Sequence, residues 1–233
     1  MPCTLPASLA DAAVCRGSFH AVLGGEAGEA VFADFSAALQ KAQAEGRILT
    51  ASLFRYENHL FFYAEGLNRP FTPQGLCPAL DAALLPWPPA LGEAAPRPWA
   101  AMQPYFYHDV PTTSADWQQG RCPQRRRGRI ALLPPDSWCS YMEHHLRIVT
   151  EGLVEGDRWH LICVQEGVLF SYLEEPRTNV NIKHRPGAHS PELDAWIAAD
   201  PESHFARFTP EQKAHPDSGH NFVFLPRIAG TED

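Results

Sequence analysis

The chain contains an internal repeat, and this repeat limits the available folds more than any other feature of the sequence. Residues 57–65 read Glu-Asn-His-Leu-Phe-Phe-Tyr-Ala-Glu, and residues 166–174 read Glu-Gly-Val-Leu-Phe-Ser-Tyr-Leu-Glu. Five of these nine positions are identical. Because the two copies lie almost half the chain apart, we expect two homologous halves, residues 1–120 and 121–233.

The two halves differ in the helix that precedes each copy. Both helical patterns end in Glu-Gly, but only the second carries a tyrosine and a histidine four residues apart, Tyr141 and His145. The corresponding positions of the first half are Phe35 and Leu39, and neither of these side chains can transfer a proton. This asymmetry predicts one working site, in the second half, and a degenerate site in the first.

Hydrophobic periodicity and turn residues predict the same order of elements in each half. In the first half we expect a strand, a helix, two hairpin strands, a short helix and a strand at 18–23, 31–42, 49–56, 59–65, 76–84 and 102–110. In the second half the corresponding elements are expected at 128–133, 138–152, 159–165, 168–174, 191–199 and 221–227. Asp136 or Ser137 is a suitable cap for the second-half helix.

This order of elements is the ferredoxin-like arrangement, in which two helices cover one face of a four-stranded antiparallel sheet. The other face of the sheet must also be buried, and the duplicated half supplies a second sheet within the same chain. We therefore predict an α+β fold of two tandem ferredoxin-like units, packed as an intramolecular pseudo-dimer of the dimeric α/β-barrel type around a cavity. The expected assembly is a monomer with this internal pseudo-dimer, or a weak homodimer.

The composition is that of an ordinary globular protein, with 45% hydrophobic and 20% charged residues. No apolar run approaches the roughly 20 residues that a membrane helix needs. Residues 1–15 also lack the basic start of a signal peptide. These features predict a cytoplasmic protein without a membrane partner.

The formal net charge of −8 argues against a nucleic-acid partner. The local basic cluster Arg125–Arg129 is interpreted as a solvated linker rather than as a polyanion contact. The six cysteines are scattered and form no Cys-x-x-Cys pair, so reduced thiols are expected and structural zinc is not.

Histidines are concentrated in the second half, which raises the alternative of a metal site. They are His144, His145, His160, His184, His189, His204, His215 and His220. However, His144 and His145 are adjacent on a helix and point about 100° apart, so they cannot easily share one ion. We expect no metal.

Tyr141 and His145 lie at positions i and i+4 and should project from one helix face, one turn apart. A histidine can accept and donate a proton near neutral pH, and a tyrosine can orient a ligand oxygen while it stays neutral. The same pair would also suit hydrogen-bonded residues at the edge of a core. The spacing alone leaves both roles open.

A longer pattern around this pair resembles the L-rhamnose mutarotase family. Residues 135–151 have the Pro-Asp start of that family and then its Tyr-x-x-x-His-x-x-Ile-x-x-Glu helix. Residues 168–170, Val-Leu-Phe, resemble its third strand, and residues 223–226, Val-Phe-Leu-Pro, resemble its closing strand. The resemblance covers about residues 128–228, whereas the first half matches only in outline.

The resemblance implies that His145 is the proton donor and that Tyr141 binds the sugar. Two positions differ from the family: His160 stands where the family has a tyrosine, and Phe205 begins the segment where it has a Trp-Trp pair. We expect His160 and Phe205 to line the pocket as substrate-binding residues. The loss of the indole pair leaves the identity of the sugar open.

The function implied by this resemblance is an isomerase that interconverts the anomers of a reducing sugar, rhamnose-like, by general acid–base catalysis. The substrate would be a monosaccharide, and neither a metal nor an organic cofactor is needed. Two alternatives are a non-enzymatic barrel that binds a small molecule and a cofactor-free oxygenase of the dimeric α/β-barrel group. The segment 177–189 is expected to be a surface loop rather than a lid.

Overall fold

A computed structural model describes residues 7–179, 182–212 and 221–231. The chain forms two compact units. Unit 1 comprises Met1–Met102, Pro111–Pro123 and Pro226–Asp233, and unit 2 comprises Gln103–Val110 and Gln124–Leu225. Both are built from helices and antiparallel strands, which confirms the α+β class. No helix in the described ranges is long and apolar enough to cross a membrane.

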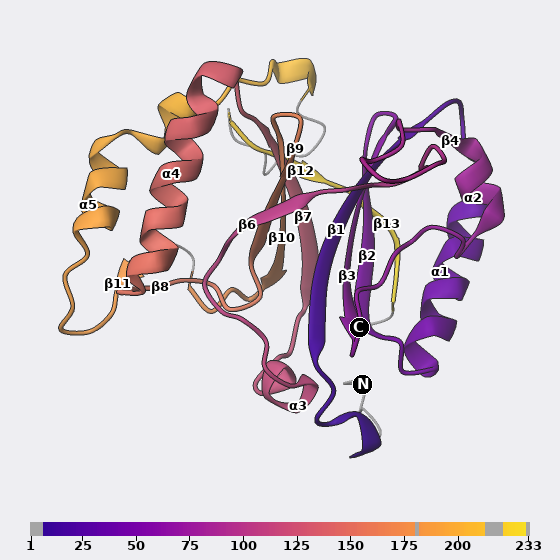
Figure 1. Cartoon of the computed structure of the whole chain (residues 1–233), viewed down its shortest axis with the longest axis horizontal. Helices are drawn as coiled ribbons and strands as arrows, with labels where there is room; N and C mark the ends of the chain where they lie inside the picture. Colours follow the sequence, from indigo (N-terminus) through magenta and orange to yellow (C-terminus); the bar gives the residue numbers. More distant parts are fainter. Residues whose placement is uncertain (1–6, 180–181, 213–220, 232–233) are drawn as a thin grey trace. The chain divides into compact units, whose positions relative to one another are not determined.

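Unit 1 has a sheet in the order β13-β2-β3-β1-β4, with the short strand β5 also paired to β1. Two helices, α1 and α2, lie on one face of this sheet (Figure 1). The elements of unit 1 are η1 (Ala7–Leu9), β1 (Val14–Leu23), α1 (Glu29–Ala44), β2 (Ile48–Tyr56), β3 (His59–Leu67), α2 (Pro78–Ala83), β4 (Leu84–Leu85), β5 (Ala100–Ala101), α3 (Ser114–Gln118) and β13 (Arg227–Gly230).

Unit 2 has a sheet in the order β12-β7-β10-β9-β6 and a two-stranded ribbon of β11 and β8. Its helices α4 and α5 lie beside one face of the larger sheet (Figure 1). The elements of unit 2 are β6 (Gln103–Tyr107), β7 (Arg125–Leu132), α4 (Pro135–Glu151), β8 (Val154–Glu155), β9 (Leu161–Gln165), β10 (Val168–Glu175), β11 (Lys183–His184), α5 (Pro191–Ala198), η2 (Pro201–His204), η3 (Pro210–Gln212) and β12 (Val223–Leu225).

The repeated Tyr-x-Glu motif makes the same contact in both units. The Tyr63 hydroxyl donates to Glu65 Oε1 over 2.6 Å, and the Tyr172 hydroxyl donates to Glu174 Oε1 over 2.6 Å. The two carboxylates are almost fully buried, so each needs a cation to offset its desolvation. The cations are Arg121 and Arg126, respectively. The repeat therefore encodes one buried polar network per unit.

The repeated Glu-Gly motif ends the first helix of each unit. Gly46 and Gly152 both have φ of +69°, the left-handed conformation that glycine adopts without steric cost at a helix end. Gly152 is the C-cap of α4, and its amide donates to the Ile148 carbonyl. The sequence thus places both helix ends correctly.

The last strand of each half joins the sheet formed by the other half, which the sequence did not predict. Residues 102–110 were expected to close the first-half sheet. Instead β5 pairs with β1 in unit 1, and β6 pairs with β9 in unit 2. Similarly, β12 pairs with β7, and the strand that follows it, β13, pairs with β2 of unit 1. Each sheet therefore gains an edge strand from the other half of the chain.

The basic cluster Arg125–Arg129 belongs to strand β7, so the interpretation of a solvated linker is wrong. These residues pair in register with β10, from Glu175 opposite Arg125 to Ser171 opposite Arg129. Glu174 and Glu175 at the end of β10 form ion pairs with Arg126 and Arg127, so the positive charge of the cluster does not require full exposure to solvent. The face-to-face packing of the two predicted sheets stays a prediction.

Candidate active site between the helices and the sheet of unit 2

A cavity of about 530 Å³ lies between α4, α5 and the sheet of unit 2. It contains Tyr141 and His145 from α4 and His160 from the segment before β9. The remaining lining residues are Phe106, His108, Arg129, Gly156, Asp157, Ile162, Arg177, Ile182, Leu193, Trp196, Ile197, Pro201, Glu202 and Phe222. Its walls therefore combine aromatic rings with several titratable groups.

Helix α4 turns its buried face toward this cavity. Tyr141 and His145 are 3% and 4% exposed, as their spacing predicts for one face of a helix. The start of the helix differs from the prediction, because Pro134 is the N-cap and no side chain caps the first turn. Pro135 at the first helical position has no amide hydrogen, so the first turn has one fewer unpaired donor.

The His145 ring is held in one tautomer. Its Nδ1 lies 2.9 Å from the Tyr141 carbonyl oxygen, and a carbonyl oxygen can only accept, so Nδ1 carries the proton. Nε2 is then the ring atom that can accept a proton from a ligand. Burial lowers the pKa of His145 to about 4, so the ring is neutral at pH 7. In this state Nε2 can accept a proton, whereas the proton donor that the family resemblance implies requires a protonated ring.

Two phenols lie beside this base. The ring centroids of Tyr105 and Tyr141 are 6.1 Å apart, and those of Tyr141 and His145 are 4.3 Å apart. Burial raises the pKa of Tyr141 to about 12, although the Tyr105 hydroxyl and Arg129 partly oppose this. Burial also raises the pKa of Tyr105 well above its ordinary value. Both hydroxyls keep their protons at neutral pH and can donate hydrogen bonds.

The two remaining residues predicted to bind substrate occupy different places. His160 is 5% exposed and lines the cavity. Phe205 is also buried, but its ring packs 5.1 Å from Tyr141 and 5.0 Å from Phe222, in the core behind the cavity wall. Phe205 is not among the residues that line this cavity, and its ring packs against Tyr141.

The sequence did not point to His108, because this residue lies within the strand 102–110 that was expected to belong to the first half. Its ring packs edge-on against Phe106 at 4.8 Å and against the backbone of Gly156. Burial lowers the pKa of His108 to about 4, partly opposed by Asp157. The cavity thus has a second neutral imidazole, which only the strand exchange brings there.

The beginning of segment 177–189 also contributes to the site. Arg177 Nε donates to Asp157 Oδ2 over 3.0 Å, and the Thr178 hydroxyl donates to Asp157 Oδ1 over 2.8 Å. Asn179 Nδ2 donates to the Gly156 carbonyl over 3.0 Å. Residues 177–179 are therefore anchored to the cavity wall, while residues 180–181 lie outside the described ranges.

Arg129 is another cavity residue that the sequence did not identify as part of the site. It lies on β7, on the same face as Ala131 of the helix-side core, and it lines the cavity. Its guanidinium stacks over the Phe222 ring at 4.4 Å. Its Nε is buried without a hydrogen-bond partner.

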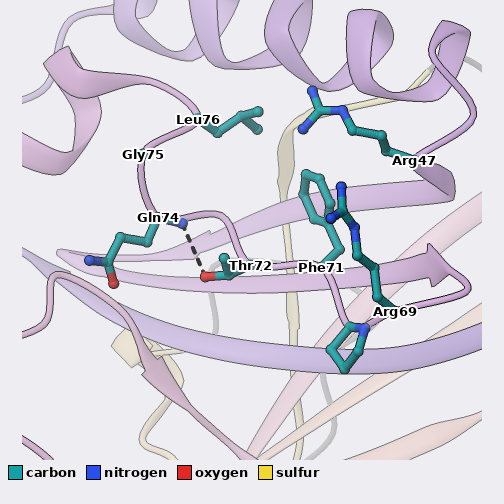
Figure 2. Close-up of a pocket in the computed structure, with 8 residues that line it drawn as sticks. Arg47, Arg69, Phe71, Thr72, Gln74, Gly75 and Leu76 are labelled. Carbon is teal, nitrogen blue, oxygen red and sulfur yellow. Dashed lines mark hydrogen bonds between the residues drawn. The ribbon is translucent and has the colours of Figure 1, made fainter. Parts of the chain in front are cut away.

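Unit 1 has a smaller pocket of about 330 Å³ beside the segment that follows β3. Figure 2 shows Arg47, Arg69, Phe71 and Gln74 around it. Arg69 is exposed, and Arg47 pairs with Glu45. The residues that line this pocket include no histidine, cysteine or carboxylate, so it offers cations but no acid–base group.

The positions of unit 1 that correspond to Tyr141 and His145 are filled with apolar side chains. Phe35 and Leu39 are 1% and 0% exposed, and the Phe35 ring packs on Phe62 and Trp99. Proton transfer by these side chains is chemically excluded. Within the described ranges, no group of three potential ligands is placed to hold a metal ion. His215 and His220 lie outside those ranges.

No protein-family model matches this chain, and no match was found among curated proteins. The chain is similar in structure to a proposed monooxygenase from Fusobacterium nucleatum, with a TM-score of 0.40, 9% identity and 94% of each chain covered. It is also similar to a proposed monooxygenase from Lactobacillus acidophilus, with a TM-score of 0.38, 7% identity, and 94% of this chain and 96% of the other covered. An anthrone oxidase-like protein matches with a TM-score of 0.38, 7% identity and 92% of each chain covered.

Proposed function

We propose that the cavity of unit 2 is an active site in which His145 removes a proton from an acidic hydroxyl group of a small organic molecule. The observation that carries this proposal is the hydrogen bond from His145 Nδ1 to the Tyr141 carbonyl, inside a cavity large enough for a ligand. This bond leaves Nε2 as a proton acceptor. General base catalysis of this kind contributes about 100- to 10,000-fold to a rate.

The low pKa of His145 restricts the substrate. A base with a pKa of about 4 is weak, so it acts best on a hydroxyl whose anion is already stable. A phenol, with a pKa of about 10, suits this base better than an aliphatic hydroxyl. The Phe106 and Trp196 rings lie 4.6 Å and 4.7 Å from the His145 ring and supply walls for an aromatic ligand.

The reaction that we favour is oxidation of a phenol by molecular oxygen. The hydroxyl proton passes to His145 Nε2, and the resulting phenolate donates electrons to oxygen. One oxygen atom forms a new bond to a ring carbon, which loses its hydrogen. The other leaves as water with the two hydrogens that the substrate has lost. The phenol becomes a quinone, and oxygen is the only oxidant required.

Oxygen uptake with a panel of phenols and anthrones tests this proposal. We expect uptake with the wild-type protein and a loss of about 100-fold or more in His145→Ala. Uptake should also fall as the pH drops through about 4, because protonated His145 cannot act as a base. Equal uptake by the wild type and His145→Ala would contradict the proposal.

Sugar anomer interconversion is a second candidate, favoured by the adjacent Tyr141 and His145 in the cavity. His145 would take the proton of the anomeric hydroxyl as the bond between the anomeric carbon and the ring oxygen breaks. It would then return the proton to the ring oxygen, and closure on the other face would give the other anomer. Tyr141 would orient the sugar by hydrogen bonding.

Exchange spectroscopy by NMR on rhamnose and other reducing sugars separates the two candidates. Anomer exchange that accelerates with protein and slows in His145→Ala would support the isomerase. Ligand binding with neither exchange nor oxygen uptake would leave the non-enzymatic binding barrel as the function.

A further inference from the structure

We propose that the Arg129 guanidinium is the anion-binding group of the unit 2 cavity and that it holds an oxyanion of the ligand. This inference deepens the proposed function, because the hydroxyl deprotonated by His145 becomes such an oxyanion. It assigns a role to a residue that neither the sequence pattern nor the family resemblance identified.

The contacts of Arg129 leave its charge without a counterion. The guanidinium makes no hydrogen bond and no ion pair with any residue in the described ranges, and its one specific contact is the stacking on Phe222. The other arginine of the cavity, Arg177, is bound by Asp157 at 3.0 Å. Burying a cation without a hydrogen-bond partner is costly, and an anionic ligand in the cavity would offset this cost.

Four groups in the described ranges face Arg129, and the one anion among them, Glu202, is exposed to solvent, so it does not offset the buried guanidinium as a buried partner would. The four groups are Tyr105, Tyr141, Arg177 and Glu202. The two tyrosines are neutral, and the carboxylate of Glu202 is exposed and accepts a hydrogen bond from Asn221. Burial lowers the pKa of Arg129 to about 10, which still leaves the guanidinium charged at pH 7.

The chemistry of the guanidinium selects an oxygen anion. Its planar set of N–H donors matches the lone pairs of a phenolate or carboxylate. Beside the aromatic rings that line the cavity this attraction is stronger than in water, because the local dielectric is lower. The anion could be created by His145 from a hydroxyl, or it could be a permanent carboxylate of the ligand.

The first experiment uses 4-nitrophenol, whose phenolate absorbs visible light where the phenol does not. Titration of the bound dye reports its protonation state directly. We expect the pKa of bound 4-nitrophenol to lie at least one unit below that of the free dye, which corresponds to about tenfold preference for the anion. Arg129→Met should abolish this shift. The control Arg147→Met, on the exposed face of α4, should leave it unchanged.

The second experiment separates the two sources of the anion by calorimetry with benzoate and its neutral analogue benzamide. Benzoate binding at least tenfold tighter than benzamide, with the preference lost in Arg129→Met, identifies a permanent carboxylate. A pKa shift of 4-nitrophenol without this preference identifies an anion created in the site. Binding without preference for any anion, or no binding of all three probes, overturns the proposal.

These measurements do not depend on turnover. A shifted pKa of bound 4-nitrophenol without oxygen uptake would overturn the proposed function and leave the anion site standing. Arg129→Met should melt at the same temperature as the wild type or higher, because an unpaired buried charge is removed. A lower melting temperature would show a structural role for Arg129, contrary to the proposal. Arg129→Lys, which keeps the charge but not the planar donors, should keep part of the shift.

Discussion

At the scale of single residues, two buried histidines that line the cavity of unit 2 are neutral at pH 7. His145 and His108 both have a pKa of about 4 because burial disfavours their charged forms. A histidine in the unfolded chain has a pKa of about 6.5. Between these two pH values the unfolded chain binds more protons than the folded one.

This difference predicts a loss of stability in mild acid. The stability contributed by the two neutral histidines is fully present above pH 6.5, and it is lost as the pH falls toward 4. Each histidine should account for at most about 3.5 kcal/mol, at about 1.4 kcal/mol per unit of pKa. Chemical denaturation between pH 4 and pH 7 measures this loss.

The test compares a double variant, in which His108 and His145 are both replaced by glutamine, with the control variant His189→Gln. The double variant should show a smaller change of stability between pH 4 and pH 7 than the wild type. The control removes a histidine whose side chain is 75% exposed and should leave the dependence unchanged. A steep loss that persists in the double variant would show that other groups cause it.

Gly156 is required for the position of His108. A Cβ atom at residue 156 would lie 1.9 Å from His108 Cδ2, far inside van der Waals contact. Gly156→Ala should therefore displace the imidazole and destabilise the protein by about 1–3 kcal/mol. Thermal denaturation measures the loss of stability, and binding of 4-nitrophenol reports the displacement of the imidazole in the cavity.

Gly25→Ala is the control for this substitution, because a Cβ at residue 25 meets no atom within 4 Å. It should leave stability and binding unchanged. Equal effects of the two substitutions would contradict the role assigned to Gly156.

At the scale of elements, α1 and α4 occupy equivalent places in the chain but differ in what they present to the sheet. Helix α4 carries two polar aromatic side chains on its buried face, and α1 carries Phe35 and Leu39 there. In unit 1 the buried face of α1 packs into the hydrophobic core and contributes to stability. In unit 2 the buried face of α4 lines the candidate site.

Leu39→Ala should accordingly cost about 2–5 kcal/mol in the free energy of unfolding, the usual range for a fully buried leucine. Below the unfolding transition, the affinity of unit 2 for 4-nitrophenol should not change. The control Leu85→Ala removes a side chain that is 51% exposed and should alter stability by no more than about 0.5 kcal/mol. Weaker binding in Leu39→Ala would show that the site depends on unit 1.

At the scale of the whole molecule, each sheet is completed by an edge strand from the other half of the sequence: β13 in unit 1 and β6 in unit 2. Strand β13 joins the sheet of unit 1 through its ladder with β2. Side chains strengthen this contact, since Arg227 Nε donates to Ser52 Oγ over 3.0 Å and the Ala51 amide donates to Thr231 Oγ1 over 3.2 Å. The C-terminal segment is thus an integral part of the N-terminal sheet.

Deletion of residues 227–233 should expose the edge of β2 and lower the melting temperature. Hydrogen exchange should speed up at the amides of β2 that bond to β13, and the amides of β7 should keep their protection. Deletion of residues 232–233 alone leaves β13 in place and should have little effect. Unchanged exchange in β2 after the longer deletion would contradict the observed strand order.

The local pattern of the sequence predicts much of this fold, because hairpins and helices are encoded by neighbouring residues. Strands β2, β3 and β10 and helix α4 lie close to their predicted ranges, and Gly46 and Gly152 mark two helix ends. The Tyr141 and His145 pair follows from helical spacing in the same way. These features need no knowledge of the tertiary structure.

Only the tertiary structure shows the exchange of β6 and β13, because strand pairing joins residues far apart in the chain and leaves no local periodic signal. The same reason applies to the site. His108 is brought to the cavity by β6, and the pairing of β7 buries Arg129, whose Nε has no hydrogen-bond partner among the described residues. The sequence by itself determined where the tyrosine and histidine stand, whereas burial in the tertiary structure lowers the pKa of the histidine and sets which charges surround it.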